Sequence, residues 1–427
     1  MTSSTGKMET AFPAFLGRSV LVLVENLSVP FDRRVWQECR SLRHAGLDVT
    51  VISPRGIDRD TEVFEEREGI KIHRFPLHAA NGGSRSYLRE YVEAVWQIRK
   101  LIRALSHGQR FDVVHASNPP DILLLLAMPL RRRDRARLVF DHHDLAPELY
   151  LSRFNRRKDF LYGILRLLER LSFHLANVAI ATNESYREIA IRRGGKRAED
   201  VFVVRNSPDL AEFVPAKPSP TLKRGKRFLI TYVGMMGPQD GVDYALRALA
   251  KLANRRTDWH ALFVGAGDVL PAMHALAEEL GLRNSVEFTG LLERHAVLRV
   301  ISTADVCLSP EPRNPLNDKS TMIKVAEYMA LGRPIVAFDL WETRATAEGA
   351  ALYSPPNDEA RFAERINELL SDDRLRQELG ERGRTRVRSA LSWTHSEQQL
   401  LAAYEHLFRD ETKAPGDQTQ SAEVAAA

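Results

Sequence analysis

The chain has 427 residues, of which 44% are hydrophobic and 27% are charged, and its formal net charge is +5. These totals are typical of a soluble globular protein with two domains. They exclude a disulfide framework, because the two cysteines, Cys39 and Cys307, lie far apart and neither belongs to a metal-binding spacing. We therefore expect a protein of the reducing cytoplasm.

Positive charge is concentrated in the first half of the chain. Residues 1–210 contain 34 Lys and Arg and 26 Asp and Glu, which leaves a small negative charge for the rest. This indicates an anionic partner, either an anionic membrane surface or a phosphorylated substrate, with a solvated basic face as the alternative. The longest apolar run, 122–130, is too short to span a bilayer, and the N-terminus lacks the pattern of a secretory signal. A peripheral location at the inner membrane face stays open, with "RRRDRAR" and "RFNRRKD" as candidate contacts.

Strand and helix patterns alternate along the first half. A helix is predicted over 86–107, where apolar residues recur every three or four positions. Such alternation predicts a parallel, doubly wound sheet covered by helices. The predicted strands cover 19–26, 48–53, 112–117, 137–142 and 177–182.

The alternation breaks at a Pro- and Lys-rich stretch over 207–226 and then restarts, which predicts a linker and a second doubly wound domain. Its predicted strands cover 227–234, 260–267, 285–290, 304–309, 334–339 and 350–354. Two such domains facing each other across a cleft would bring two substrates together and exclude water on closure. The predicted segments are a flexible N-terminus (1–17), an N-terminal domain (18–210), a linker (211–226), a C-terminal domain (227–391), a C-terminal helix (392–410) and a disordered tail (411–427).

Glycines follow two predicted strands of the second half. "FVGAGD" places Gly265 and Gly267 after a strand, but the third glycine of a dinucleotide fingerprint is missing, so a tight turn and a ligand contact stay open. "YVGMMGPQDG" places Gly234, Gly237 and Gly241 between a strand and a helix. Such a loop can offer backbone N–H groups to a phosphate, which we favour here over simple turn chemistry.

Histidines follow two strands of the first half. In "LVFDHHD", His142 and His143 are adjacent on an extended segment, so their side chains point to opposite sides and should not share a metal ion. We expect one of them to face the cleft and to contact a sugar hydroxyl or developing charge. In "DVVHASNPPD", His115 and Asn118 end another strand, where a locally bonded polar loop is the favoured alternative to a binding role.

The stretch "NDKSTMIKVAEYMALGRP" (317–334) predicts a helix with a carboxylate, Glu327, on a partly apolar stripe. Asp318, Ser320 or Thr321 can cap its N-terminus, and the free N–H groups that follow can bind phosphate. Glu327 is then either a buried acceptor for a ribose diol or a surface partner of Lys324. Spacing alone does not decide between these two.

Taken in their order, the motifs resemble those of the retaining glycosyltransferases of family 4, which have the GT-B fold. The resemblance spans roughly residues 20–408. It implies an α/β protein that moves a hexose-type sugar from a nucleotide-sugar, expected to be a UDP-sugar, to a glycan or lipid-linked acceptor, without a metal or cofactor and without contact with nucleic acid. The motifs are "VWQECRSLRHAGLDVTVISP", "FDVVHASNPPD" and "LVFDHHD" in the N-terminal half, and "FVGAGD", "VEFTGLL", "ADVCLSP" and "VAEYMALGRPIVAFD" in the C-terminal half.

The resemblance also implies roles for single residues. Glu327 matches the second glutamate of an E-x7-E motif, which holds the ribose, and His143 matches a histidine that contacts the transferred sugar. The donor is expected in the C-terminal domain and the acceptor in the N-terminal domain. The C-terminal helix of the chain is expected to return to the N-terminal domain. The remaining expected donor-binding residues are Gly234, Met235, Gly237, Gly265, Thr289, Gly290, Leu291, Ser320 and Thr321, and the expected acceptor-binding residues are Arg33, Arg34, His115, Asn118 and Asp144.

The chain departs from the family pattern where positive charge is expected. The first glutamate of the motif is replaced by Lys319, and Met235 and Asp240 stand where an arginine and a lysine usually hold the diphosphate. We hypothesise that Lys319 or Lys324 supplies the missing charge as a catalytic group beside His143, aided by Arg33 or Arg34. Two alternatives stay open, a sugar-nucleotide 2-epimerase and a degenerate, non-catalytic assembly partner.

Overall fold

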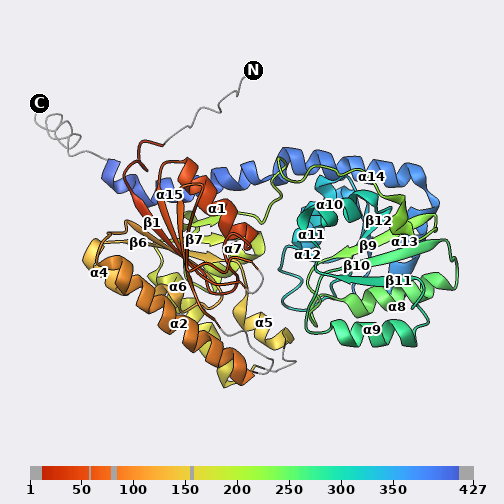
Figure 1. The fold of residues 1–427 in the computed structure, drawn as a ribbon, viewed down its shortest axis with the longest axis horizontal. Coiled ribbons are helices and arrows are strands. Elements are labelled where there is room, and N and C mark those ends of the chain that lie inside the picture. Colours follow the sequence, from red (N-terminus) through yellow and green to blue (C-terminus); the bar gives the residue numbers. More distant parts are fainter. Residues whose placement is uncertain (1–11, 57–58, 78–83, 154–157, 413–427) are drawn as a thin grey trace, which may run out of the picture. The chain divides into compact units, whose positions relative to one another are not determined.

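The computed structural model describes residues 12–56, 59–77, 84–153 and 158–412. Its described residues form two compact units (Figure 1). The first unit holds residues up to 146, residues 163–204 and residues from 397 on, and the second holds 147–162 and 205–396. Each unit contains one sheet between helices, so the predicted α/β class with two doubly wound domains is confirmed.

The sheet of the first unit has the order β3-β4-β2-β1-β5-β6-β7-β8 in the described residues and is parallel except for β3. Its inner strands β1 and β5 are buried along their whole length, as expected for a parallel sheet with helices on both faces. The strands are β1 (Ser19–Leu23), β2 (Asp48–Pro54), β3 (Phe64–Arg67), β4 (Ile70–Phe75), β5 (Val113–Ser117), β6 (Arg137–His142), β7 (Val178–Ala181) and β8 (Val201–Val203).

Helices alternate with these strands as the sequence predicts. The side chain of Asp32 caps the first helix by accepting a hydrogen bond from the backbone N–H of Val35. The predicted helix over 86–107 is observed as α2, shifted by one or two residues. The helices are α1 (Arg33–His44), α2 (Ser84–Ser106), α3 (Leu123–Leu126), α4 (Met128–Asp134), α5 (Ala146–Arg153), α6 (Phe160–Leu175) and α7 (Glu184–Arg192).

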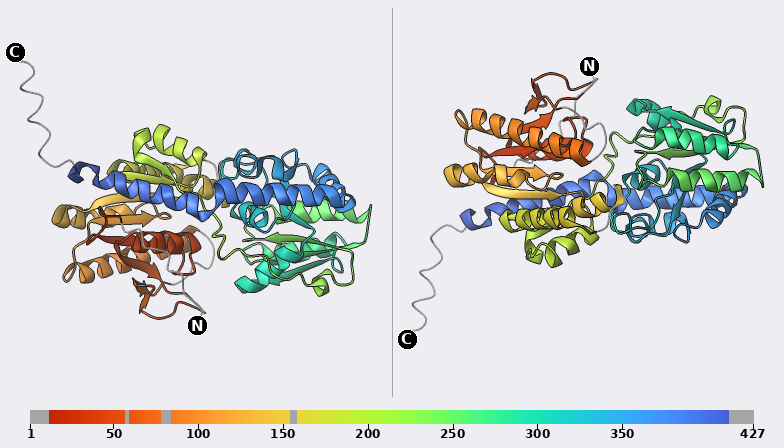
Figure 2. Two further views of the ribbon diagram at one scale, coloured as in Figure 1. Left: turned by 90° about the horizontal axis from the view of Figure 1, so that it is seen from above. Right: turned by 90° about the horizontal axis from the view of Figure 1, so that it is seen from below.

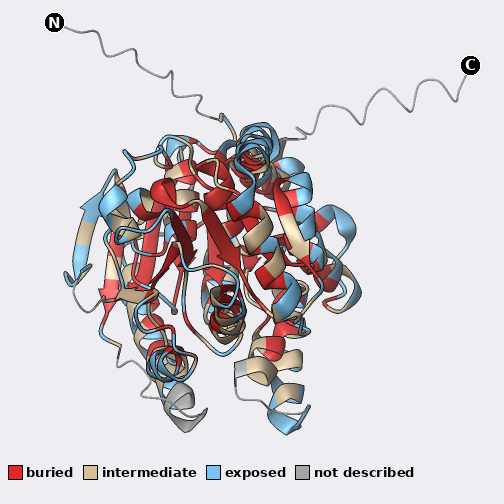
Figure 3. Cartoon of the chain, turned by 90° about the vertical axis from the view of Figure 1, so that its right-hand side faces the viewer, coloured by how far each residue is buried: buried red, intermediate tan, exposed pale blue. Residues whose placement is uncertain are grey.

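The sheet of the second unit is parallel throughout, with the order β11-β10-β9-β12-β13-β14 in the described residues. Buried residues line its strands and the covering helix faces (Figure 3). The strands are β9 (Phe228–Val233), β10 (Trp259–Val264), β11 (Val286–Gly290), β12 (Val306–Ser309), β13 (Ile335–Phe338) and β14 (Ala351–Ser354). The helices are α8 (Val242–Ala253), α9 (Leu270–Glu279), α10 (Arg294–Thr303), α11 (Ile323–Ala330), α12 (Trp341–Ala347), α13 (Glu359–Ser371) and α14 (Asp373–Arg386), and the chain ends with α15 (Trp393–Thr412), which leaves this unit.

The last helix, α15, returns to the first unit, as expected (Figure 2). The Ser41 hydroxyl donates to the Glu397 carboxylate at 2.6 Å, and the Tyr404 hydroxyl lies 2.9 Å from Nδ1 of His115. Phe15 is fully buried against Tyr404. The predicted flexibility of 1–17 is therefore wrong from residue 12 onward, because this segment packs on α15; residues 1–11 lie outside the described residues.

The unit boundaries differ from the predicted ones. The first unit ends at 204 instead of 210, and 147–162 group with the second unit. The predicted linker is also attached to the second unit, because the backbone N–H groups of Ala216 and Ser219 donate to the hydroxyls of Ser302 and Thr303. The predicted C-terminal helix, 392–410, is observed as α15, and most of the predicted tail lies outside the described residues.

Candidate functional site

Three glycines meet at the carboxyl ends of neighbouring strands in the second unit. The backbone N–H of Gly234 donates to Val264, and that of Gly265 donates to Gly290. A Cβ on Gly265 would lie 1.8 Å from the carbonyl oxygen of Gly234, and both residues have a positive φ. Only glycine fits this close approach of two loops, which lie at the edge where ligands of parallel sheets bind.

A buried cation lies beside these glycines. Lys324, on α11, forms an ion pair with Glu311, and its ammonium donates to the Tyr232 hydroxyl at 3.0 Å. Its ammonium nitrogen is 3.1 Å from the place where a Gly234 side chain would begin. Burial would lower the pKa of Lys324, but Glu311 outweighs it and raises the pKa, so Lys324 stays charged. The positive charge next to the glycine loop is therefore compensated by Glu311. That Lys324 binds a diphosphate stays a prediction.

Glu327 is buried on the same helix, with 9% of its surface exposed. The neighbouring Tyr328 hydroxyl accepts a hydrogen bond from the backbone N–H of Val233, which ties α11 to the end of β9. The alternative of a surface glutamate is wrong, because Glu327 is buried; the Lys324 ammonium pairs with Glu311. Ribose binding by Glu327 stays a prediction.

The predicted N-cap of this helix is wrong. The helix begins at Ile323, and its N-cap residue is Met322, which offers no side-chain acceptor. The Ser320 hydroxyl instead donates to the Leu316 carbonyl, and Asp318 accepts from the backbone N–H of Trp341. Ser320 and Thr321 therefore do not cap the helix. That Lys319, Ser320 and Thr321 contact the nucleotide-sugar stays a prediction.

One predicted phosphate contact is occupied by the chain itself. The backbone N–H of Gly237 donates to the Asp240 carboxylate at 2.8 Å, so an acidic group already holds this part of the loop. A phosphate contact by Gly237 stays a prediction, and it would require this hydrogen bond to be exchanged. Met235 and Leu291 are exposed at the ends of β9 and β11, and the Thr289 hydroxyl donates to the carbonyl of Gly290.

In the first unit, His143 is held by a buried carboxylate. Its Nδ1 lies 3.1 Å from Asp141, and Asp141 accepts two hydrogen bonds from Arg34 at 2.6 and 3.0 Å. The ring keeps 12% of its surface exposed, whereas His142 is fully buried against Phe173. The expectation that one histidine is packed and the other stays accessible agrees with this arrangement.

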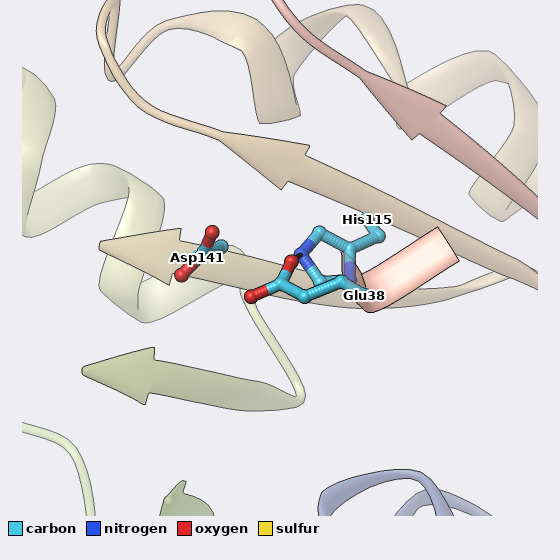
Figure 4. Close-up of side chains that lie close together, drawn as sticks. All are labelled: Glu38, His115 and Asp141. Carbon is cyan, nitrogen blue, oxygen red and sulfur yellow. Dashed lines mark ion pairs between the residues drawn. The ribbon is translucent and has the colours of Figure 1, made fainter. Parts of the chain in front are cut away.

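The buried cluster continues behind His143. Glu38, His115 and Asp141 lie together (Figure 4), and Nε2 of His115 is 3.5 Å from Glu38. Their ligand atoms are close enough to hold a metal ion, but the Arg34 guanidinium lies 3.1 Å from Glu38 and already binds Asp141. Burial raises the pKa of Glu38 to about 7. The group is a charge-compensated network built from the chain alone.

Three expected acceptor contacts are corrected by this network. His115 is 1% exposed beneath α15, and Arg34 is committed to Asp141, Glu38 and the carbonyl of Val204. Asn118 is 2% exposed and bonds four atoms of its surroundings, including the backbone N–H groups of His143 and Asp144. These side chains shape the strand ends and are too buried to contact an acceptor.

Two expected acceptor contacts are compatible with the geometry. Arg33 is exposed in the first turn of α1, and Asp144 is half-buried next to His143. Burial raises the pKa of Asp144. Their contact with an acceptor stays a prediction.

Sequence reasoning missed Glu25, just beyond the end of β1. Its side chain is 3% exposed, and burial, reinforced by Glu90, raises its pKa to about 8. Burial raises the pKa of the Tyr91 phenol, and the charges of Glu25 and Asp144 add to this effect. The sequence did offer a signal for Glu25, because it is a carboxylate directly after the first buried strand, and ligands of parallel sheets bind at such strand ends.

We expect His143 to remain protonated in the neutral range. Burial would lower its pKa, but Asp141 outweighs burial and raises it to about 9 from an ordinary 6.5. Because the folded-state pKa is the higher one, the stabilisation is complete below pH 6.5 and is lost as the pH rises through about 9. An NMR titration of the imidazole signals, with His143→Gln to assign the resonance, measures this directly. A resonance that titrates near pH 6.5 contradicts the expectation.

Both halves of the chain match families of known proteins. Residues 32–207 match the model of a glycosyl transferase 4-like domain, and residues 227–372 match that of glycosyl transferases group 1. Two parallel-sheet domains of this kind, in this order, are those of the GT-B class. The chain belongs to the GT-B glycosyltransferases of family 4 type.

Curated relatives include three transferases or synthases. The chain is 25% identical to D-inositol 3-phosphate glycosyltransferase of Corynebacterium urealyticum, over 86% of this chain and 88% of the relative. It is 28% identical to alpha-maltose-1-phosphate synthase of Mycolicibacterium smegmatis, over 57% and 66%. It is 26% identical to alpha-D-kanosaminyltransferase of Streptomyces kanamyceticus, over 42% and 46%. The chain thus spans about half to two thirds of the length of the last two.

Solved structures share the fold. The sucrose-phosphate synthase of Thermosynechococcus elongatus has a TM-score of 0.76 at 18% identity, over 92% of this chain and all of that one. HepE of Anabaena, in complex with UDP-glucose, has a TM-score of 0.69 at 18% identity, over 91% and 99%. Within the part of the chain that the structure describes, every helix is too short or too polar to cross a membrane.

Proposed function

We propose that the protein is a retaining glycosyltransferase that transfers a hexose-type sugar from a nucleotide-sugar to a hydroxyl group of a glycan or lipid-linked acceptor. The observation that carries the proposal is the edge of the second sheet, where Gly234, Gly265 and Gly290 meet without side chains on the helix side that holds the buried Lys324 and Glu327. A diphosphate can approach a backbone without side chains, and a buried carboxylate can accept from a ribose diol.

In the proposed reaction, the sugar–diphosphate bond loosens while the acceptor hydroxyl attacks from the same face. The diphosphate gains negative charge, which the Lys324 ammonium and the α11 N-terminus stabilise. His143, protonated and fixed by Asp141, orients the transferred sugar and adds positive charge. The leaving phosphate oxygen takes the proton of the acceptor hydroxyl, so no nucleophilic side chain, metal or cofactor is needed in this scheme.

Transfer is favoured over the two alternatives. The relatives described above are transferases and synthases, which supports transfer over 2-epimerisation. The compact glycine edge and the buried Lys324–Glu311 pair are elaborate features that support a working donor site over a degenerate one. Incubation with a nucleotide-sugar alone distinguishes them further, because only an epimerase converts it to a second nucleotide-sugar.

The donor nucleotide is the first property to test. Since HepE was solved with UDP-glucose, UDP is the first candidate. We expect UDP to raise the Tm of the protein more than GDP, ADP or TDP at equal concentration, because binding to the folded state alone stabilises it. Gly265→Val is expected to abolish this increase, since its side chain would overlap the carbonyl of Gly234. If all four nucleotides leave the Tm unchanged, a donor site of this kind is ruled out.

A further inference from the structure

A basic groove lies on the first unit between α2 and the α3–α4 segment. Its volume is about 590 Å³. Arg99 and Arg103 of α2 and Arg132 and Arg133 of α4 line it, and none of the described lining residues is acidic. Leucine and methionine side chains, including Leu125, form its apolar wall. The groove therefore combines positive charge with apolar surface.

The four arginines of the groove differ in their exposure and in their hydrogen bonds. Arg133 donates to the carbonyls of Ser106 and Gln109 and to Asp134, so it fastens α4 to the end of α2. The other three arginines are exposed. Residues 89–135 as a whole contain nine Lys and Arg against five Asp and Glu. The groove is thus the centre of a positively charged surface.

An exposed apolar stripe leads into the groove along α2. Val92 and Trp96 have 62% and 60% of their surface exposed. At 3.6 residues per turn, Val92, Trp96, Arg99 and Arg103 fall within a strip about 60° wide. Lys100 lies over the ring of Trp96 at 5.7 Å. One helix face thus begins with large apolar side chains and ends with arginines.

A second exposed apolar stripe lies on α6, which covers the same face of the sheet as α2 and α4 (Figure 2, right). Its residues in the first unit include Ile164 and Leu167, which lie three positions apart and are 36% and 65% exposed. Arg170 lies three positions further along and is exposed. Apolar stripes of this size on a protein surface mark a binding face.

We propose that this face, called here the basic–apolar face and made of Val92, Trp96, Arg99, Arg103, Arg132 and the α6 stripe, docks on an anionic phospholipid bilayer, with a lipid phosphate in the groove. Aromatic rings partition into the bilayer interface, aliphatic side chains enter the acyl boundary, and arginines bind lipid phosphates. Charge complementarity favours an anionic bilayer, and the aliphatic residues between the arginines distinguish it from a nucleic-acid site, which needs few of them.

The test is co-sedimentation of the full chain with vesicles of two compositions, equal parts phosphatidylglycerol and phosphatidylcholine, or phosphatidylcholine alone. We expect binding to the mixed vesicles only. Arg103→Glu/Arg132→Glu should weaken this binding by about 30-fold or more, because each basic residue near an anionic surface contributes to the affinity. Trp96→Ser should weaken it at constant charge. Wild-type tryptophan emission should shift to shorter wavelength on binding, and Trp96→Ser should lack this shift, which assigns it to Trp96 among the five tryptophans.

The matched control is Arg374→Glu/Arg388→Glu, which makes the same change in net charge at exposed arginines of the second unit. It should bind vesicles like the wild type. The proposal is overturned if the wild type fails to bind the mixed vesicles, or if both double variants lose binding equally. It is also overturned if the loss in Arg103→Glu/Arg132→Glu appears with single-stranded RNA and not with vesicles. The increase in Tm with UDP should be the same in all these variants, so a failure here is distinguishable from a failure of the donor site.

Discussion

Replacement of Lys324 by methionine is expected to lower the free energy of unfolding by about 3–5 kcal/mol, the usual cost of leaving one partner of a buried ion pair uncompensated. Glu311 would then remain buried without its cation, while the Ser309 hydroxyl still donates to it at 2.5 Å. Urea denaturation measures the effect. Lys251→Met serves as the control, because it removes a half-exposed lysine 3.8 Å from Glu359 and should cost less than about 1 kcal/mol.

A double variant separates stability from donor binding. Lys324→Met/Glu311→Gln removes both charges and should recover most of the lost stability, because a neutral pair of similar volume avoids an unpaired buried charge. If Lys324 stabilises the diphosphate, this stable double variant should still show a strongly raised donor KM or a lowered kcat. Recovery of both stability and wild-type kinetics would show that Lys324 only supports the fold.

Replacement of His143 by alanine is expected to lower kcat by about 10²–10³-fold, the range observed when one preorganised donor to developing charge is removed. The histidine lies in the first unit, and the expected nucleotide site in the second, so the affinity for UDP should change little. Turnover and the Tm increase with UDP are therefore measured on the same variant. His295→Ala, at an exposed position on α10, is the control and should leave both unchanged.

The opposite result is equally informative. If His143→Ala retains wild-type turnover, His143 does not act on the sugar, and the Asp141–Arg34 network is purely structural. If turnover and UDP affinity fall together, the histidine contributes to nucleotide binding or to folding. The variant Asp141→Asn then shows whether the pKa of His143 matters. It removes the carboxylate that raises this pKa, so His143 should lose its proton, and the enzyme its activity, at a lower pH.

The sequence was sufficient for the fold because the signals were local. Continuous apolar strands such as β1 and helices such as α2 have periodicities that a single window reveals. β3, with the sequence FEER, was missed because it is a mostly exposed edge strand without an apolar pattern. The three-residue β8 is too short for any periodicity.

The site was predicted only in part because its main contacts are not local. Glu327 lies on a helix whose apolar stripe is visible in the sequence, and its burial could be anticipated. The partner of Lys324 lies 13 residues away across an irregular loop, and that of Arg34 lies 107 residues away on another strand. Spacing rules describe neighbours on one helix or strand, so they left a Lys324–Glu327 pair open and could not show that Arg34 and His115 belong to one buried network.

The attachment of α15 to the first unit also determines when that unit can finish folding. The residues that bury Phe15 and bond His115 are among the last of the described chain, so during synthesis the first unit emerges from the ribosome long before its final helix. Until then, His115 and the apolar surface around Phe15 lack their cover, which is the kind of exposed surface that chaperones bind. If the chain were cut at residue 204 and the last helix supplied as a peptide, folding would become bimolecular, and its midpoint would depend on the peptide concentration.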